Sequence, residues 1–215
     1  YNSKFIIDIF SKFKIMKKKY LVTGGAGFIG SHLSEALSKK GKVVVIDNLF
    51  QGKKLKINKN IKLVKGDVRN KRLLEKYSKG CHAIFHLAAI IGVDVVSQNK
   101  TKNMDIEFEG LRKICQCAKN NKVKKIIYAS SSGVYGKLNY ENKVKENAIV
   151  APISGYALSK RTGEIYLKNF SEEHKISCAA VRLFNVYGKR QDKRMVIPRF
   201  VQLAREGKNI KIYGN

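Results

Sequence analysis

Tyr156 and Lys160 stand four positions apart in the segment YALSK, a spacing that puts two side chains on one face of a helix. A phenol with a pKa of about 10 is a poor base at neutral pH, but a fixed ammonium nearby favours the phenolate. Such a pair could therefore take a proton from a substrate hydroxyl group. The pattern Y-x-x-x-K is also common by chance, and alone it fits an exposed surface pair equally well.

Three serines, Ser130, Ser131 and Ser132, follow the apolar run IIYA and are expected at the carboxyl end of a strand. A hydroxyl group at that edge could hydrogen-bond the substrate oxygen and share its proton with the tyrosine. The alternative is a serine-rich loop start, which is a common feature of soluble proteins.

Gly24, Gly27 and Gly30 recur at a spacing of three in YLVTGGAGFIGSHL. The apolar run KYLVT before them predicts a buried strand, and the apolar residues from Phe28 onward recur at helical spacing, with Gly41 as a candidate C-cap. Glycines let the chain turn sharply and let an anion approach the N-terminus of the helix. The turn is therefore predicted to hold a pyrophosphate, with a plain tight turn as the alternative.

Asp47 ends the next apolar run, KVVVIDN, seventeen residues after Gly30. A carboxylate at this place can accept hydrogen bonds from both hydroxyls of an adenosine ribose, and it repels a 2′-phosphate. The sequence therefore favours NAD over NADP. The alternative is that Asp47 is only a turn residue at a strand end.

The elements that must position these residues alternate along the chain, which predicts an α/β fold with a doubly wound parallel sheet and ligands at the carboxyl ends of the strands. Strands are expected at 19–23, 42–48, 60–68, 81–89, 123–132 and 176–184, and helices from residue 28 and at 103–121, 156–174 and 197–206.

The net charge of +28 raises the possibility of a nucleic-acid partner. However, 35 of the 44 basic residues are lysines, and they are spread along the whole chain rather than gathered on one element. We therefore expect no specific nucleic-acid partner.

The four cysteines show no metal-ligand spacing, so no metal is expected and reduced thiols in the cytoplasm are the default. No apolar run approaches the about 18 residues that a membrane span needs, so no membrane partner is expected.

Taken together, these segments resemble the NAD-dependent epimerase/dehydratase family, the extended short-chain dehydrogenases/reductases that act on nucleotide sugars, and within it enzymes similar to UDP-glucose 4-epimerase. The matching segments span most of residues 16–215. They are VTGGAGFIGSHL, VIDNL, KGDVRN, FHLAA, YASSSGVYG, ISGYALSKRTGE and VRLFNVYGKRQ.

The resemblance implies roles for individual residues. Catalysis falls on Ser131, Tyr156 and Lys160, with Tyr156 as the base and Lys160 also bonding the nicotinamide ribose, while Ser131 and Asn185 contact the substrate. The implied cofactor is NAD, and the substrate class is a nucleotide sugar, most simply a UDP-hexose. The cofactor contacts are implied for Gly24, Gly27, Phe28, Ile29, Gly30, Asp47, Asn48, Asp67, Val68, Leu87, Ala88 and Ala89.

The resemblance also implies a homodimer built on the helices at 103–121 and 156–174, and a substrate-binding region after the NAD-binding domain. Met16 and the segment MKKKYLVTGG form a natural beginning for the first strand. Residues 1–15 are expected to be an extension outside the fold, 16–183 the Rossmann NAD-binding domain, and 184–215 the beginning of a smaller substrate-binding region that is incomplete.

Two departures from the family pattern stand near the expected site: Glu107 and Leu111 replace the usual Asn and Thr around Gly110. They put the local packing, and with it the activity, in question. A third position bears on the reaction, because relatives that eliminate water commonly have an acidic residue where this chain has Gly133. We therefore expect a 4-epimerase. A 4,6-dehydratase, a decarboxylase, a dehydrogenase or a catalytically silent NAD-binding protein are the alternatives.

Overall fold

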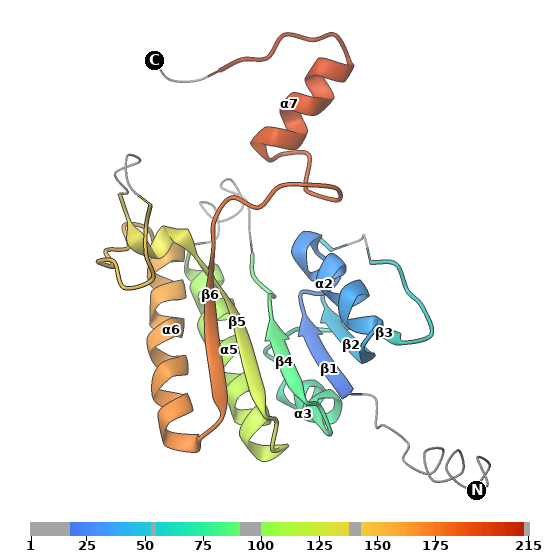
Figure 1. Ribbon diagram of the computed structural model, residues 1–215, viewed down its shortest axis with the longest axis vertical. Coiled ribbons are helices and arrows are strands. Elements are labelled where there is room, and N and C mark those ends of the chain that lie inside the picture. Colours follow the sequence, from blue (N-terminus) through green and yellow to red (C-terminus); the bar gives the residue numbers. More distant parts are fainter. Residues whose placement is uncertain (1–17, 53–54, 91–99, 138–142, 213–215) are drawn as a thin grey trace, which may run out of the picture.

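A computed structural model describes residues 18–52, 55–90, 100–137 and 143–212 (Figure 1). Its centre is a six-stranded sheet in the order β3-β2-β1-β4-β5-β6, with every neighbouring pair parallel. This order is that of the doubly wound dinucleotide-binding fold, so the predicted fold class is confirmed. The strands are β1 (Lys18–Thr23), β2 (Gly41–Asp47), β3 (Ile61–Lys65), β4 (Ala83–His86), β5 (Lys125–Ser131) and β6 (Ser177–Leu183).

The strand order reverses beside β1, which pairs with β2 on one side and with β4 on the other. The last four residues of β1 are all buried, as expected for a parallel strand covered on both faces. Ligands of such sheets bind in the crevice outside the carboxyl ends of the strands at the reversal point. A ligand-binding site is therefore expected at the carboxyl ends of β1 and β4.

Within the described residues, five α-helices and one 3-10 helix connect or follow the strands. They are α2 (Phe28–Ser38), α3 (Lys71–Ser78), α5 (Lys100–Asn120), η1 (Ser132–Tyr135), α6 (Gly155–His174) and α7 (Val196–Arg205). The sequence analysis did not identify α3, although it carries an N-terminal signal: the side chain of Asn70 accepts a hydrogen bond of 3.0 Å from the Leu73 N–H.

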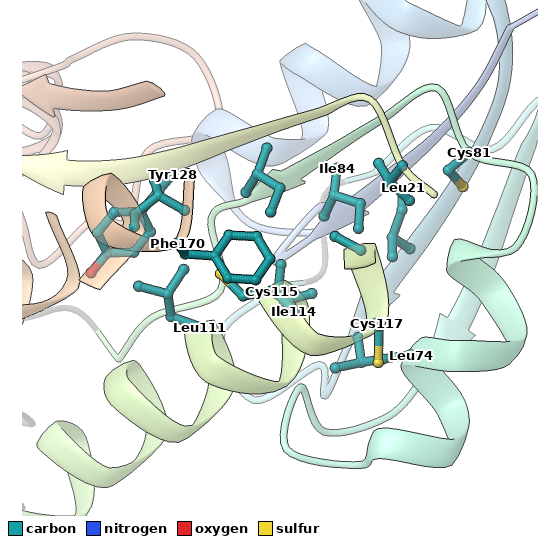
Figure 2. Close-up of a cluster of buried hydrophobic side chains, with 14 of the residues drawn as sticks. Leu21, Leu74, Cys81, Ile84, Leu111, Ile114, Cys115, Cys117, Tyr128 and Phe170 are labelled. Carbon is teal, nitrogen blue, oxygen red and sulfur yellow. The ribbon is translucent and has the colours of Figure 1, made fainter. Parts of the chain in front are cut away.

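The core lies on both faces of the sheet. On one face, α3, α5 and α6 bury a large cluster that includes Leu74, Ile114 and Phe170 (Figure 2). On the other face, α2 packs over β1 and β2 with a second cluster around Val22. Leu111, one of the two departures from the family pattern, is fully buried in the first cluster, where its apolar side chain is well accommodated.

One local prediction was wrong. Gly41 is not the C-cap of α2, a position that Lys39 occupies, but the first residue of β2. A Cβ atom at Gly41 would collide with the carbonyl oxygen of Lys18 in the neighbouring strand. The glycine is therefore needed for close approach of two strands rather than for ending a helix.

Cys115 and Cys117 point to different neighbours from α5, as their spacing predicted. Cys117 faces α3, where its Sγ lies 3.9 Å from the carbonyl oxygen of Lys71, whereas Cys115 lies in the core cluster against which Cys178 of β6 packs. Within the described ranges, no group of three or more His, Cys, Asp or Glu side chains could hold a metal ion.

After β6 the chain leads to α7, which lies beyond the carboxyl edge of the sheet and has no buried residue (Figure 1). Within the described parts of the chain, no helix combines the length and apolar character needed to cross a membrane. The expected extension at 1–15 lies outside the described residues.

Candidate active site

The glycine turn joins the end of β1 to α2 and packs against the end of β4. Gly24 has a φ of +69°, and a Cβ atom there would lie 2.6 Å from the backbone nitrogen of Ala88. Gly27 is the N-cap of α2 and, being glycine, offers no side chain to its first N–H groups. Phe28, Ile29 and Gly30 form the first turn of α2. An anion could therefore approach the N-terminus of the helix directly.

Asp47 lies at the end of β2 with its carboxylate fixed from two sides. Its Oδ2 accepts a hydrogen bond of 2.9 Å from the Ala26 N–H, and its Oδ1 accepts one of 2.8 Å from the Leu49 N–H. The side chain of the following residue, Asn48, accepts a bond of 3.0 Å from the Phe50 N–H. The carboxylate is thus held beside the glycine turn, with lone pairs left for a further donor.

The other residues expected around the cofactor line the same edge. Asp67 forms a two-pronged ion pair with Arg69, at 3.0 Å and 2.7 Å, and this guanidinium holds the pKa of the Asp67 carboxyl below its usual range. At the end of β1, the Thr23 carbonyl oxygen accepts a hydrogen bond from the Leu87 N–H, and the Thr23 Oγ1 accepts one from the Ala88 N–H. Val68 is buried, and Leu87, Ala88 and Ala89 are half-buried.

The three serines have different environments. Ser130 is buried and donates a hydrogen bond of 2.6 Å to Glu164, a carboxylate that also receives Arg182 and Arg161. Ser131 is the N-cap of η1 and its Oγ accepts a bond of 3.1 Å from the Gly133 N–H, which leaves its own proton free for another acceptor. Ser131, rather than Ser130, therefore has a hydroxyl group available to a ligand.

Tyr156 and Lys160 lie on α6, which begins with Ser154 accepting a hydrogen bond from the Ala157 N–H. The Lys160 Nζ lies 5.7 Å from the centre of the Tyr156 ring and donates a bond of 2.9 Å to the carbonyl oxygen of Ala129 in β5. The lysine is buried, while the tyrosine is half-buried. The helix thus brings the ammonium next to the phenol, as the spacing predicted.

A third residue, Glu107 of α5, completes this part of the site. Its Oε2 lies 2.7 Å from the Lys160 Nζ and accepts a hydrogen bond of 3.3 Å from the Tyr128 hydroxyl. Burial, together with the Glu107 charge, raises the pKa of Tyr128. The sequence marked Glu107 only as a departure from the family pattern and did not predict its contact with Lys160.

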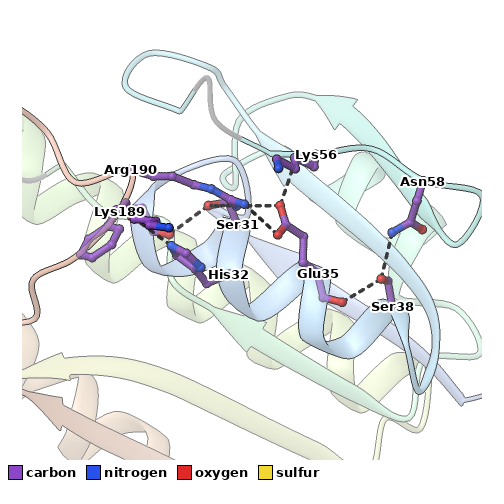
Figure 3. Close-up of polar contacts among 9 residues, drawn as sticks. Ser31, His32, Glu35, Ser38, Lys56, Asn58, Lys189 and Arg190 are labelled. Atoms are coloured by element: carbon purple, nitrogen blue, oxygen red, sulfur yellow. Dashed lines mark hydrogen bonds and ion pairs between the residues drawn. The ribbon is translucent and has the colours of Figure 1, made fainter.

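Asn185 lies two residues beyond the end of β6 and is exposed. The segment that follows it returns to α2: Arg190 pairs with Glu35, and the carbonyl oxygen of Lys189 lies 3.0 Å from a ring nitrogen of His32 (Figure 3). This link places Gly188 next to Phe28 at the start of α2. Sequence reasoning missed the link, because no short-range pattern connects residues about 155 positions apart.

A continuous edge therefore runs from Asp47 past the glycine turn to Ser131 and the Tyr156/Lys160 pair. It offers a carboxylate for ribose hydroxyls, open N–H groups for a pyrophosphate and a phenol beside an ammonium for proton transfer. A Cβ atom at Gly24 would collide with the backbone of Ala88 and one at Gly30 with the Gly24 carbonyl, so both glycines let the turn pack closely. A Cβ atom at Gly27, in contrast, would meet only the Gly24 carbonyl oxygen within 4 Å, so the N-terminus of α2 is open to a phosphate. The residues present fit a bound dinucleotide.

Comparison with known proteins gives one consistent family. The profile described as "NAD dependent epimerase/dehydratase family" matches residues 20–215. A protein of Methanocaldococcus jannaschii with the provisional name UDP-glucose 4-epimerase is 41% identical over 177 residues, which are 81% of this chain and 58% of that protein. A UDP-N-acetyl-alpha-D-glucosaminuronate decarboxylase of Bacillus cytotoxicus is 35% identical, covering 93% of this chain and 65% of the relative.

Among solved structures, a UDP-N-acetylglucosamine 4-epimerase from Methanobrevibacter ruminantium M1, in complex with UDP-N-acetylmuramic acid, superposes with a TM-score of 0.87. It is 38% identical and is matched over 93% of this chain and 66% of its own. The chain thus spans between 58% and 66% of the length of these three proteins. The profile match covers nearly the whole chain, and the chain belongs to the NAD-dependent epimerase/dehydratase family.

Proposed function

We propose that this protein is a nucleotide-sugar 4-epimerase that uses NAD and acts on a UDP-hexose. The observation that carries the choice of reaction is Gly133, at the point where Ser131 and the start of α6 meet. A Cβ atom at Gly133 would lie 3.4 Å from the Ser131 Oγ and 3.5 Å from the Ala157 Cβ. An acidic side chain at this position would stand directly in the reaction site, and here it is absent.

Elimination of water needs both a proton acceptor and a proton donor besides the base that starts the reaction. A 4-epimerase needs only one base, and room for the keto sugar to turn and present its other face. A glycine between Ser131 and Ala157 leaves that room and supplies no second acid. Gly133 therefore favours epimerisation at C4.

The cofactor would be held at the carboxyl edge of the sheet, by the residues between Asp47 and the glycine turn described above. The glycine turn and the N-terminus of α2 would receive its pyrophosphate, and Asp47 its adenosine ribose. NAD, when bound, accepts hydride from the sugar carbon and returns it. The contacts of Asn48, Asp67, Val68, Leu87, Ala88 and Ala89 with the cofactor, and of Asn185 with the diphosphate of the substrate, belong to this proposal.

The chain's own chemistry is proton transfer at the C4 hydroxyl. Tyr156 would take the proton, because the Lys160 ammonium, 5.7 Å from its ring centre, favours the phenolate. Ser131 would donate its free hydroxyl proton to the same sugar oxygen, since its lone pairs already receive the Gly133 N–H. When the ketone is reduced again, Tyr156 would return the proton.

Decarboxylation is the second candidate, favoured by the similarity to the Bacillus cytotoxicus enzyme.

We further propose a homodimer through α5 and α6, on which Phe108, Leu158 and Ile165 expose large apolar side chains. A cytoplasmic location fits the four free thiols, three of them buried.

The test is incubation of the full-length protein with NAD and a panel of UDP-, dTDP- and GDP-sugars in deuterium oxide. A 4-epimerase gives a product of unchanged mass with inverted C4 and no carbon-bound deuterium, because the hydride returns to the carbon that it left. Loss of water or carbon dioxide, or deuterium on a carbon, would contradict the proposal. Tyr156→Phe serves as the control, since any product that it still forms does not depend on this base.

A further inference from the structure

Lys160 has a buried counter-ion. The carboxylate of Glu107 comes from α5 and the ammonium from α6, and the two atoms in contact, Oε2 and Nζ, are 2.7 Å apart. The side chain of Glu107 is 0% exposed and that of Lys160 is 3% exposed. Since ion pairs weaken least where water is excluded, this pair is screened far less than a surface pair.

We propose that Glu107 is a positioning residue for catalysis: it fixes Lys160 beside Tyr156, and its negative charge offsets the ammonium charge next to the phenol. This inference rests on the roles proposed above for Tyr156 and Lys160. It goes beyond them because the family usually has a neutral Asn where this chain has Glu107, so the charge is a property of this chain.

The fixing of Lys160 follows from its contacts. The ammonium donates to Glu107 on one side and to the carbonyl oxygen of Ala129 on the other, at 2.7 Å and 2.9 Å. Its Nζ also lies 4.9 Å from the centre of the Tyr128 ring. Tyr128 in turn donates to Glu107, so α5, β5 and α6 all hold the same charged atom.

The effect on Tyr156 follows from the sum of charges near it. A lone ammonium favours the phenolate, but an ammonium paired with a carboxylate adds little net charge, so less of that benefit remains. Removing the carboxylate charge makes it easier for a neighbouring phenol to lose its proton, because the phenolate no longer lies near a second negative charge. The ionisation of Tyr156 should therefore move to lower pH when Glu107 is made neutral.

The other titratable groups around the pair do not replace Glu107. His86 of β4, stacked on Tyr128, is kept neutral because burial and the Lys160 charge lower its pKa to about 3. Glu164 of α6 is already bound by Ser130, Arg161 and Arg182. Among the described residues, Glu107 is the carboxylate in contact with Lys160.

The experiment titrates Tyr156 directly, without substrate. The chain has ten tyrosines and no tryptophan, so tyrosine labelled with ¹³C at Cζ gives few signals, and Tyr156→Phe assigns the one of interest. In Glu107→Gln, which keeps the size of the side chain, we expect the titration midpoint of Tyr156 to fall by about one pH unit. Glu107→Asp keeps the charge and should keep the midpoint close to that of the parent.

Glu172→Gln is the matched control, because it removes one carboxylate from an exposed pair on α6 and should leave the midpoint unchanged. If Glu107→Gln does not fold, Glu107→Asn, the usual family residue, is titrated instead. An unchanged midpoint in a folded neutral variant overturns the inference, whatever the reaction is. In the full-length enzyme the acid limb of the kcat/KM profile should shift in the same direction, whereas a purely structural defect would lower activity equally at every pH.

Discussion

Arg190 and Glu35, 155 residues apart in the chain, form a two-pronged ion pair with an Nη1–Oε1 distance of 2.6 Å and an Nη2–Oε2 distance of 2.8 Å (Figure 3). The pair ties the segment after β6 to α2, the helix that begins at the glycine turn. Its guanidinium holds the pKa of the Glu35 carboxyl below the usual range, so the pair persists at neutral pH. The segment that leads away from the sheet is thereby anchored beside the expected pyrophosphate site.

Replacing Glu35 with Gln should loosen this segment without unfolding the domain. Trypsin should then cleave at Lys189, Arg190 and the basic residues that follow several-fold faster, while the thermal midpoint changes little, because partly exposed ion pairs add little to global stability. Mass spectrometry of timed digests identifies the sites. Glu172→Gln removes a comparable carboxylate from an exposed pair on α6 and should not change cleavage at these sites. Equal cleavage in the Glu35 variant would mean that the pair does not anchor the segment.

Asp47→Ala should weaken NAD binding by about ten- to a hundredfold, the range expected when hydrogen bonds to a charged acceptor are lost. It should also narrow the preference for NAD over NADP, because the carboxylate that repels a 2′-phosphate is gone. Isothermal titration calorimetry with both dinucleotides measures the two effects. Asp105→Asn, an exposed change on α5, is the control. Unchanged NAD affinity in Asp47→Ala would remove Asp47 from the site.

Ser130→Ala and Ser131→Ala should separate stability from activity. Ser130→Ala removes the buried donor to Glu164 and should lower the free energy of unfolding by about 1–3 kcal/mol. Ser131→Ala removes only the cap of η1 and should cost less than about 1 kcal/mol, yet lower kcat by about 10²-fold or more. Urea unfolding and steady-state kinetics give the two quantities. The reverse pattern would show that Ser130, not Ser131, serves the substrate.

The sequence predicted the features that depend on short-range pattern. Apolar runs identified all six strands of the sheet, and the glycine spacing identified the turn that meets Ala88. The i, i+4 spacing was enough to place Lys160 beside Tyr156, because both lie on one helix. These features need no knowledge of which elements pack together.

Apart from α3, which has a local N-cap signal, the features that were missed join elements distant in the sequence. Glu107 contacts Lys160 from another helix, and Arg190 pairs with Glu35 although all six strands of the sheet except β1 lie between them in the sequence. The sequence around Glu107 and Glu35 does not distinguish these two carboxylates from the solvent-exposed ones. Gly41 was wrongly predicted to be a C-cap for a related reason. The β1 backbone that crowds it, at Lys18, is distant from Gly41 in the sequence although it lies beside it in the sheet.

His86 is a fully buried imidazole whose protonation is linked to folding. Its Nδ1 lies 2.7 Å from the Thr23 Oγ1, and its ring stacks on Tyr128 with centres 5.8 Å apart. Burial, with a smaller contribution from the Lys160 charge, lowers its pKa from 6.5 to about 3. In the unfolded chain the same imidazole takes a proton near pH 6.5.

Between about pH 6.5 and 3 the unfolded state therefore binds a proton that the folded state does not, so stability should fall as the pH falls. The slope for one such group is about 1.4 kcal/mol per pH unit, which gives a loss of about 2 kcal/mol between pH 6.5 and pH 5. Carboxylates with lowered pKa values, such as Glu164, add their own loss only at lower pH. Urea unfolding at about pH 7.5 and pH 5 should show this loss in the parent and in His32→Gln, a change at an exposed position of α2, but much less of it in His86→Gln. An equal loss in all three would assign the pH dependence to other groups.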